Sequence, residues 1–251
     1  GYFIDYQQTN TTFHPACSPC EEVERVNPER SPRIYQQKEV EPGDDYFLLD
    51  VVVGSTCNLA CPFCSAEVSS LIAQVAAKHQ DEALPVKWRD TPKVNAEPAS
   101  VGNLIADFIS NRKVKRLKII GGEPLLKENW DPLSNLIESG MCENMDFALT
   151  TNGTIVNDRL ISNLHKVKSA ILTVSADSIG KNYDFIRWPY SWEKAKKNID
   201  YLIDNAPEST HINVDGVVSI INFELLPEAD AEFSNWYSHS FNFDLKPSGS
   251  A

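Results

Sequence analysis

Hydrophobic and polar positions follow two different periods along the chain, and these periods predict strands and helices in turn. The apolar run at 46–53 is rich in β-branched residues and ends at Gly54, a pattern typical of a buried strand. Apolar residues at helical spacing follow at 65–78. After a proline-containing loop at 80–96, further helices are predicted over 100–111, 130–139, 158–167, 192–205 and 227–239, and further strands over 114–120, 145–150, 170–175, 211–221 and 241–246.

The regular alternation of strands and helices predicts an α/β fold with a parallel sheet covered by helices. In such folds the functional groups gather at the carboxyl ends of the strands. The unusual segments of this chain lie at those positions: Cys57–Cys64, Gly121–Pro124, Asn152, Ser175 and Asp177. We therefore expect one site at this end of the sheet, against the alternative that these segments are ordinary polar turns.

The first 45 residues differ from the rest in composition. They contain nine acidic residues, four basic residues and five prolines, so they are predicted to be mainly irregular, with a boundary near Pro42 and Gly43. This gives two regions, 1–45 and 46–251. The chain has no initial methionine and stops after a Ser/Gly-rich segment, which leads us to expect a fragment of a longer protein.

Charge and cysteine usage narrow the functional classes. The net charge of −12 disfavours general nucleic-acid binding, because phosphates repel an acidic chain. No apolar run approaches the ~20 residues of a membrane span, and no signal peptide is visible. Five of the six cysteines fall in two clusters, which is typical of metal ligands in a reduced compartment and not of a secreted disulfide scaffold. We expect a cytoplasmic protein.

The stronger cluster consists of Cys57, Cys61 and Cys64. Three thiolates within eight residues are soft ligands that suit an iron–sulfur cluster or zinc. A [4Fe–4S] cluster normally takes four cysteines, so three would leave one iron open, as catalytic metal sites do. Zinc, with Cys142 or a histidine as fourth ligand, is the alternative; otherwise Cys142 is expected to be a buried structural thiol.

The spacing Cys-x3-Cys-x2-Cys, with Asn58 after the first cysteine and Phe63 before the last, resembles the radical S-adenosylmethionine (SAM) superfamily. The segment Gly121–Pro124 is similar to the GGEP motif of that superfamily and follows the second strand, as it should. The resemblance implies a partial (β/α)6 TIM-like barrel over about 46–246. It also implies a [4Fe–4S] cluster on Cys57, Cys61 and Cys64, with SAM bound to the open iron.

The same resemblance implies a set of cofactor-binding residues. Backbone carbonyls of the GGEP segment and the Glu123 carboxylate would hold the SAM ammonium group, Ser175 and Asp177 would face the ribose, and Arg187 would meet the SAM carboxylate. Taken alone, Ser175 and Asp177 could be turn residues, Arg187 a surface ion pair and the valines of 217–221 core residues. The full predicted set is Phe63, Gly121, Gly122, Glu123, Pro124, Asn152, Ser175, Asp177, Arg187 and Val218.

The weaker cluster, Cys17-x2-Cys20, is open to zinc, redox or iron–sulfur interpretations. With the polar residues that follow it, the pair resembles the twitch-domain radical SAM proteins, which implies an auxiliary iron–sulfur cluster. The further upstream cysteines of that group are absent from this sequence. Trp188 and Trp192 match the same group, and we expect them to pack a helix against the barrel in preference to contacting substrate.

The resemblance implies an enzyme in which reductive cleavage of SAM gives a 5′-deoxyadenosyl radical that abstracts hydrogen from a substrate. We expect a peptide or protein side chain as substrate, with a small metabolite or sugar as the alternative. A non-catalytic zinc or iron–sulfur binding module is the alternative outside enzymes. Flavodoxin or ferredoxin is the expected electron donor.

Overall fold

The computed structural model describes residues 25–26, 47–79, 98–234 and 241–244. The chain forms two compact units, Gly1–Asp45 and Tyr46–Ala251, and the features described below belong to the second. Its parallel strands form one sheet in the order β1-β2-β3-β4-β5-β6, which is also their order in the sequence. The strands are β1 (Phe47–Val52), β2 (Val114–Ile120), β3 (Asp146–Thr151), β4 (Ser169–Ser175), β5 (Thr210–Val217) and β6 (Phe241–Asp244). This α/β architecture, with β1 and β6 at the two edges, confirms the predicted open barrel.

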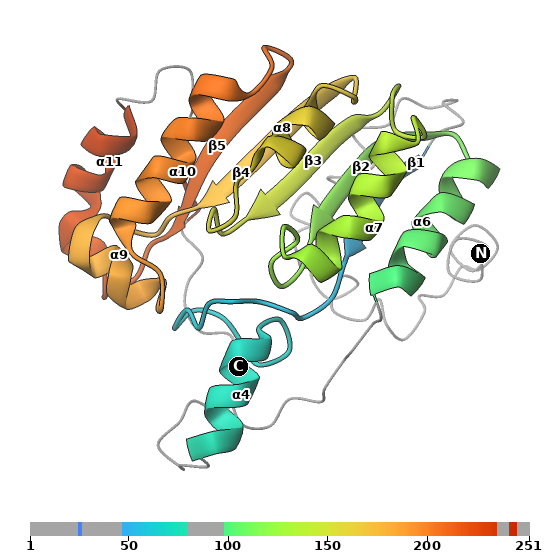
Figure 1. Ribbon diagram of the computed structural model, residues 1–251. Coiled ribbons are helices and arrows are strands. Elements are labelled where there is room, and N and C mark those ends of the chain that lie inside the picture. The colour runs from blue at the N-terminus through green and yellow to red at the C-terminus, as the bar shows by residue number, and fades with distance from the viewer. Residues whose placement is uncertain (1–24, 27–46, 80–97, 235–240, 245–251) are drawn as a thin grey trace. The chain divides into compact units, whose positions relative to one another are not determined.

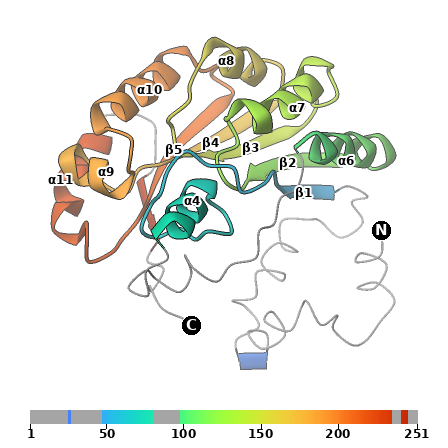
Figure 2. The ribbon, with the colours of Figure 1, turned by 60° about the horizontal axis from the view of Figure 1, so that its bottom comes forward.

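Helices α6, α7, α8 and α10 lie along one face of the sheet, and α4 lies beyond the ends towards which the strand arrows point (Figures 1 and 2). Gly102 in α6 allows close packing on α7, since a Cβ there would lie 2.7 Å from the Cβ of Pro132. The helical segments are α4 (Ser70–His79), α6 (Pro98–Asn111), α7 (Lys127–Glu138), α8 (Asp158–Leu164), α9 (Gly180–Ile186), α10 (Trp192–Asn205), η3 (Phe223–Leu225) and α11 (Leu226–Ser234).

The core lies between the sheet and these covering helices. Alternate strand residues such as Ile119, Leu149 and Leu172 are fully buried, and they belong to one cluster with Trp130 and Ile137 of α7. The intervening strand residues face the other side of the sheet and are only partly buried. The two-residue period of the strands therefore separates a packed face from a face that remains open to a ligand.

Two elements begin or end differently from the prediction because of side-chain hydrogen bonds. Helix α4 begins at Ser70 and not at 65, since the hydroxyl of Ser69 accepts the N–H of Ile72 at 3.3 Å and acts as an N-cap. Strand β5 ends at Val217 and not at 221, because the Asn222 side chain accepts the N–H of Ser219 at 2.7 Å and forms a turn. Helix α9 was not predicted; its buried residues are only Tyr183 and Ile186, too few to show a period.

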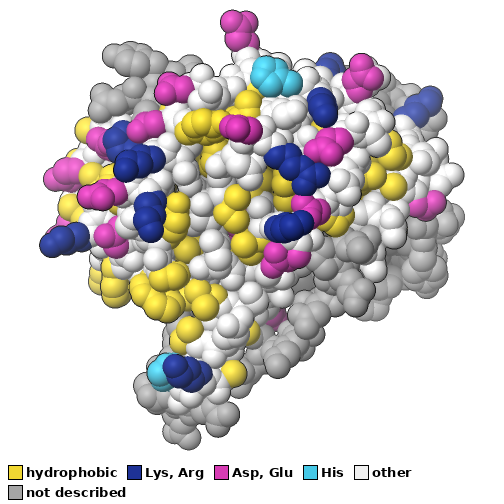
Figure 3. All heavy atoms as spheres, in the orientation of Figure 1, with side chains coloured by type: hydrophobic (Ala, Val, Ile, Leu, Met, Phe, Trp, Pro, Cys, Tyr) yellow, Lys and Arg dark blue, Asp and Glu magenta, His cyan; other side chains and the backbone are white. Residues whose placement is uncertain are grey.

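The helical face carries acidic and basic side chains that alternate over its surface (Figure 3). Arg159 of α8 illustrates this arrangement, pairing with Asp131 at 2.6 Å and Glu138 at 2.9 Å on α7. In the part of the chain that the structure describes, no helix has both the length and the apolar composition needed to cross a membrane.

Candidate active site

The loop Ser55–Cys64, called the cysteine loop below, is irregular and is held by hydrogen bonds from other elements. The backbone N–H of Ser70 donates to the carbonyl of Ser55 at 2.8 Å, and Ala60 N–H donates to the carbonyl of Trp188 at 2.8 Å. The Ser69 hydroxyl donates to the carbonyl of Leu59 at 2.7 Å. Helix α4 and the segment after α9 therefore fix the loop, although it lacks regular structure of its own.

The glycine pair at the end of β2 allows the cysteine loop to approach closely. Gly122 N–H donates to the carbonyl of Gly54 at 2.9 Å, and Glu123 N–H donates to the carbonyl of Thr56 at 2.7 Å. A Cβ at Gly122 would lie 2.2 Å from the Thr56 oxygen, which no side chain could tolerate without displacement. Gly121 has φ +109°, a conformation that favours glycine. The motif thus joins the second strand to the cysteine loop through backbone contacts.

Glu123 has a different orientation from the one expected of a residue that holds the SAM ammonium group. Its side chain is fully buried, and its carboxylate accepts the Leu125 N–H at 2.9 Å, the Thr151 hydroxyl at 2.7 Å and the Asn152 N–H at 2.7 Å. Burial raises the pKa of the Glu123 carboxyl, and these three donors oppose that shift. In this structure the carboxylate joins the ends of β2 and β3 and does not face the cavity. Pro124 is also buried away from the cavity.

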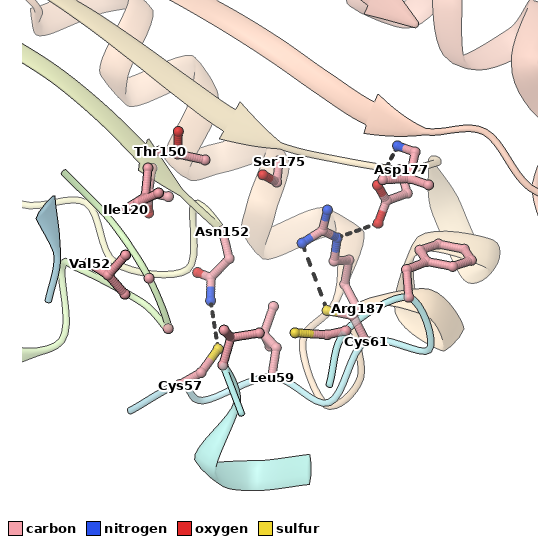
Figure 4. Close-up of a pocket in the computed structure, with 17 residues that line it drawn as sticks. Val52, Cys57, Leu59, Cys61, Ile120, Thr150, Asn152, Ser175, Asp177 and Arg187 are labelled. Atoms are coloured by element: carbon pink, nitrogen blue, oxygen red, sulfur yellow. Dashed lines mark hydrogen bonds and ion pairs between the residues drawn. The ribbon is translucent and has the colours of Figure 1, made fainter. Parts of the chain in front are cut away.

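A cavity of about 390 Å³ lies at the carboxyl ends of the strands and collects the predicted residues. Figure 4 shows side chains from the strand ends facing Cys57 and Cys61 of the cysteine loop across it. The predicted residues that line the cavity are Cys57, Cys61, Phe63, Cys64, Gly121, Gly122, Asn152, Ser175, Asp177 and Arg187. Val218 does not line it; the neighbouring Val217 does, because alternate residues of an extended segment face opposite sides.

Some cavity residues were missed by the sequence prediction. The walls also contain Val52, Ile120, Thr150, Leu59 and Val68. The first three stand at or near the ends of their strands and belong to the partly buried or exposed set. The strand period could have identified them, since they alternate with the core residues. The other two belong to irregular segments, whose orientation no sequence period indicates.

Two cysteine sulfurs each accept a side-chain hydrogen bond. The Asn152 amide donates to Cys57 Sγ at 3.9 Å, and Arg187 Nη1 donates to Cys61 Sγ at 3.8 Å (Figure 4). Burial raises the pKa of Cys57 to about 11. Burial also raises the pKa of Cys61, and the Arg187 charge opposes that shift. In the metal-free protein these groups are therefore neutral thiols that release protons when they bind a metal.

Asp177 and Arg187 form a buried ion pair, with 2.7 Å between Asp177 Oδ2 and Arg187 Nε. Their side chains are 1% and 11% exposed, so Arg187 is not the surface ion pair considered from the sequence. Burial is the largest single influence on Arg187 and disfavours its cation, but the charge and hydrogen bonding of Asp177, together with smaller contributions from Cys61 and Tyr183, outweigh burial and raise the pKa of Arg187. Asp177 Oδ1 also accepts the Val217 N–H at 2.8 Å, so this carboxylate is engaged by protein groups.

The donor set fits a [4Fe–4S] cluster. Cys57, Cys61 and Cys64 are soft ligands, and all three line one cavity. Among the described residues, no three His, Cys, Asp or Glu side chains converge on a single metal ion. Thiols that lie apart along a cavity wall are compatible with a [4Fe–4S] cluster, because each cysteine binds a different iron of the cluster.

The remaining sequence predictions concern residues outside the cavity. Cys142 is fully buried within the hydrophobic core, as expected of a structural thiol. The ring of Trp192 lies 5.3 Å from that of Tyr183 in α9 and 5.8 Å from that of Phe233 in α11, so it packs the start of α10 against neighbouring helices. Trp188 is half exposed and contributes its backbone carbonyl to the cysteine loop. Cys17 and Cys20 lie outside the described residues.

Two curated relatives resemble the chain at low identity. Molybdenum cofactor biosynthesis protein 1 of Dictyostelium discoideum is 25% identical over 154 residues, which cover 61% of this chain and 21% of that protein. GTP 3′,8-cyclase of Parasynechococcus marenigrum (strain WH8102) is 26% identical over 139 residues, which cover 53% of this chain and 34% of that protein. The chain therefore spans well under half the length of either relative.

Solved structures share the fold, and one family model matches the sequence. Streptococcus suis SuiB bound to S-adenosylmethionine matches with a TM-score of 0.53 at 15% identity, covering 98% of this chain and 50% of SuiB. SuiB bound to the precursor peptide SuiA matches with a TM-score of 0.50 at 16% identity, covering 86% and 41%. The sequence model described as the Radical SAM superfamily matches residues 51–218, more than half of the chain. The protein therefore belongs to the radical SAM superfamily, whose enzymes use a [4Fe–4S] cluster and SAM.

Proposed function

We propose that this protein catalyses hydrogen abstraction from a substrate, using Cys57, Cys61 and Cys64 to hold the cluster and the same cavity to hold SAM. The observation that carries this proposal is the meeting of all three cysteines with the strand-end residues in one cavity. When bound, the cluster supplies one electron to SAM, which divides into methionine and the 5′-deoxyadenosyl radical that takes a hydrogen atom from substrate.

The chain's own residues bind, orient and shield the reactants. The backbone of Gly121 and Gly122 lines the cavity, the Asn152 amide at the end of β3 donates to Cys57 Sγ, and the Ser175 hydroxyl at the end of β4 offers a hydrogen bond to a ligand. Apolar side chains such as Val52 and Ile120 line the side of the cavity at β1 and β2. Such walls exclude solvent and limit side reactions of the radical with groups other than the substrate. Arg187 remains the proposed contact for the SAM carboxylate, because a guanidinium suits bidentate binding.

Anaerobic reconstitution tests this proposal. The full chain is treated with iron and sulfide, then with dithionite and SAM, and 5′-deoxyadenosine is measured by mass spectrometry. We expect a brown protein that releases 5′-deoxyadenosine. Cys61→Ala should lose the cluster, whereas the matched control Cys142→Ala should keep it, since Cys142 lies in the core. A colourless protein holding one zinc ion would instead support a non-catalytic binding module.

We propose a peptide or protein side chain as substrate. The support is that SuiB, a structure of the same fold, has been solved with its precursor peptide. A small metabolite is the second candidate, favoured by the sequence similarity to GTP 3′,8-cyclase. Deuterium transfer into 5′-deoxyadenosine from deuterated peptides, compared with deuterated nucleotides, separates the two substrate classes.

We further propose that residues 1–45 form a twitch-like segment whose Cys17 and Cys20 contribute to an auxiliary iron–sulfur cluster, within a cytoplasmic protein reduced by flavodoxin or ferredoxin. The support is the spacing of the cysteines together with the polar residues that follow them. A Cys17→Ala, Cys20→Ala double variant should then bind less iron than the intact chain while keeping the main cluster. Equal iron content would contradict the auxiliary cluster.

A further inference from the structure

Arg187 is held against a cysteine sulfur by a series of contacts that begins at the buried side chain of Asn222. The Asn222 side chain, 1% exposed, donates to the carbonyl of Asp177 at 2.6 Å. The Asp177 carboxylate accepts the Val217 N–H through one oxygen and lies 2.7 Å from Arg187 Nε through the other. Arg187 Nη1 then donates to Cys61 Sγ at 3.8 Å. The guanidinium therefore has one edge against a carboxylate and another towards a sulfur.

The backbone supports the same placement. Arg187 N–H donates to the carbonyl of Tyr183 at 2.7 Å, and its own carbonyl accepts the Tyr190 N–H at 2.9 Å. The end of α9 thus fixes the start of the side chain, while Asp177 fixes its end. Holding a long side chain at both ends removes much of its rotamer freedom, so the contact with sulfur does not depend on a bound ligand.

The two sulfur contacts differ in charge. The Cys57 sulfur accepts a hydrogen bond from the neutral amide of Asn152, and the Cys61 sulfur accepts one from the positively charged guanidinium of Arg187. Arg187 directs Nη1 at the Cys61 sulfur, whereas Asp177 pairs with Nε of the same guanidinium. Hydrogen bonds to the sulfurs and local net charge are among the factors that set the potential of an iron–sulfur cluster. A donor with positive charge favours the reduced cluster, which carries one more negative charge.

From this geometry, and resting on the proposed function, we infer that Arg187 raises the reduction potential of the cluster by donating a charged hydrogen bond to the Cys61 sulfur, with Asp177 as its positioning residue. This role is separate from binding of the SAM carboxylate, because it operates in the absence of SAM. A hydrogen bond to a charged group is large enough to change the ratio of reduced to oxidised cluster about tenfold, which is 59 mV for one electron.

The test is a redox titration of the reconstituted full chain without SAM, followed by electron paramagnetic resonance. Removing both charges with Asp177→Asn and Arg187→Met avoids leaving one buried charge unpaired. At the wild-type midpoint potential, we expect the ratio of reduced to oxidised cluster to be about tenfold lower in this double variant than in wild type. Arg187→Lys keeps the charge but loses the fork of donors, so it should shift the potential in the same direction by less. The matched control is Arg159→Met, which removes an ion-paired arginine outside the cavity and should leave the potential unchanged.

The outcomes separate the two proposals. If wild type binds a cluster and cleaves SAM but the double variant and Arg187→Lys both keep the wild-type midpoint, the inference is overturned and the proposed function stands. Loss of SAM affinity with an unchanged midpoint would assign Arg187 to SAM binding only, and would overturn it equally. If wild type assembles no cluster, both proposals fail. Should the double variant not fold, as judged by circular dichroism, the Arg187→Lys midpoint decides.

Discussion

The buried carboxylate of Glu123 gives the sharpest test of the site's construction. It accepts three hydrogen bonds, and all three partners are donors. In Glu123→Gln the amide has one oxygen, which can replace Oε1 and keep the Leu125 and Thr151 contacts. The amide nitrogen then faces the Asn152 N–H, and one buried donor is left without an acceptor. That loss costs about 1–3 kcal/mol.

The assay is urea and thermal unfolding of the metal-free protein at pH 7. A loss of about 2 kcal/mol lowers Tm by about 4–8 °C for a domain of this size. Glu208→Gln, at an exposed turn, is the control and should leave Tm unchanged. If Glu123→Gln unfolds like wild type but loses SAM affinity, the carboxylate faces the ligand and our reasoning about its buried role is wrong.

Three further predictions follow from individual contacts. Gly122→Ala should displace the cysteine loop, lowering stability by about 1–3 kcal/mol and the iron content on reconstitution. Gly140→Ala meets no atoms but is strained at φ +84°, so it should lower stability while keeping the wild-type iron content, and equal iron in both variants would refute the clash. Burial raises the pKa of Cys142 from 9.0 to about 11, so at pH 8 its alkylation should be at least about a hundredfold slower in the native protein than in urea. The native rate should rise about tenfold with each unit of increasing pH up to about 11, and rapid labelling of native Cys142, detected by peptide mapping, would contradict this. Asn222→Ala removes the side-chain donor to the carbonyls of Asp177 and Val217 and should lower the unfolding free energy by about 1–3 kcal/mol. Asn205→Ala, at an exposed position, should leave the unfolding free energy unchanged, and equal urea midpoints for the two variants would contradict the prediction.

The fold could be predicted largely because its strands carry apolar residues, often at alternate positions, and end at recognisable residues. Gly54 and Gly121 follow β1 and β2 and terminate the strand pattern visibly. The two misplaced ends are set by local hydrogen bonds of Ser69 and Asn222, but each of these side chains also makes a second contact with a more distant residue. The start of α4 is set by Ser69, whose hydroxyl also reaches the carbonyl of Leu59, and a local window of sequence contains no sign of that bond.

The candidate site likewise contains features that the sequence predicts and features that it does not. The cysteines and glycines could be predicted because their spacing forms a recognisable local motif, although the contact that requires glycine at 122 is with Thr56 of the cysteine loop. The orientation of Glu123 could not, since its partners Thr151 and Asn152 are 28 and 29 residues away. Asp177 was likewise expected to face a ribose, but its carboxylate contacts Val217 and Arg187, 40 and 10 residues later. Sequence indicates which groups reach a cavity, and long-range pairing decides which atoms face it.

The cysteine loop obtains its shape from parts of the chain that are synthesised after it. The Asn58 amide donates to the Thr154 hydroxyl at 2.9 Å across 96 residues, and Ala60 N–H donates to the carbonyl of Trp188. A nascent chain that has just left the ribosome with its three thiols has no template to space them. We therefore expect the loop to bind iron with its native spacing only after the chain has been translated beyond Trp188 and the barrel has folded.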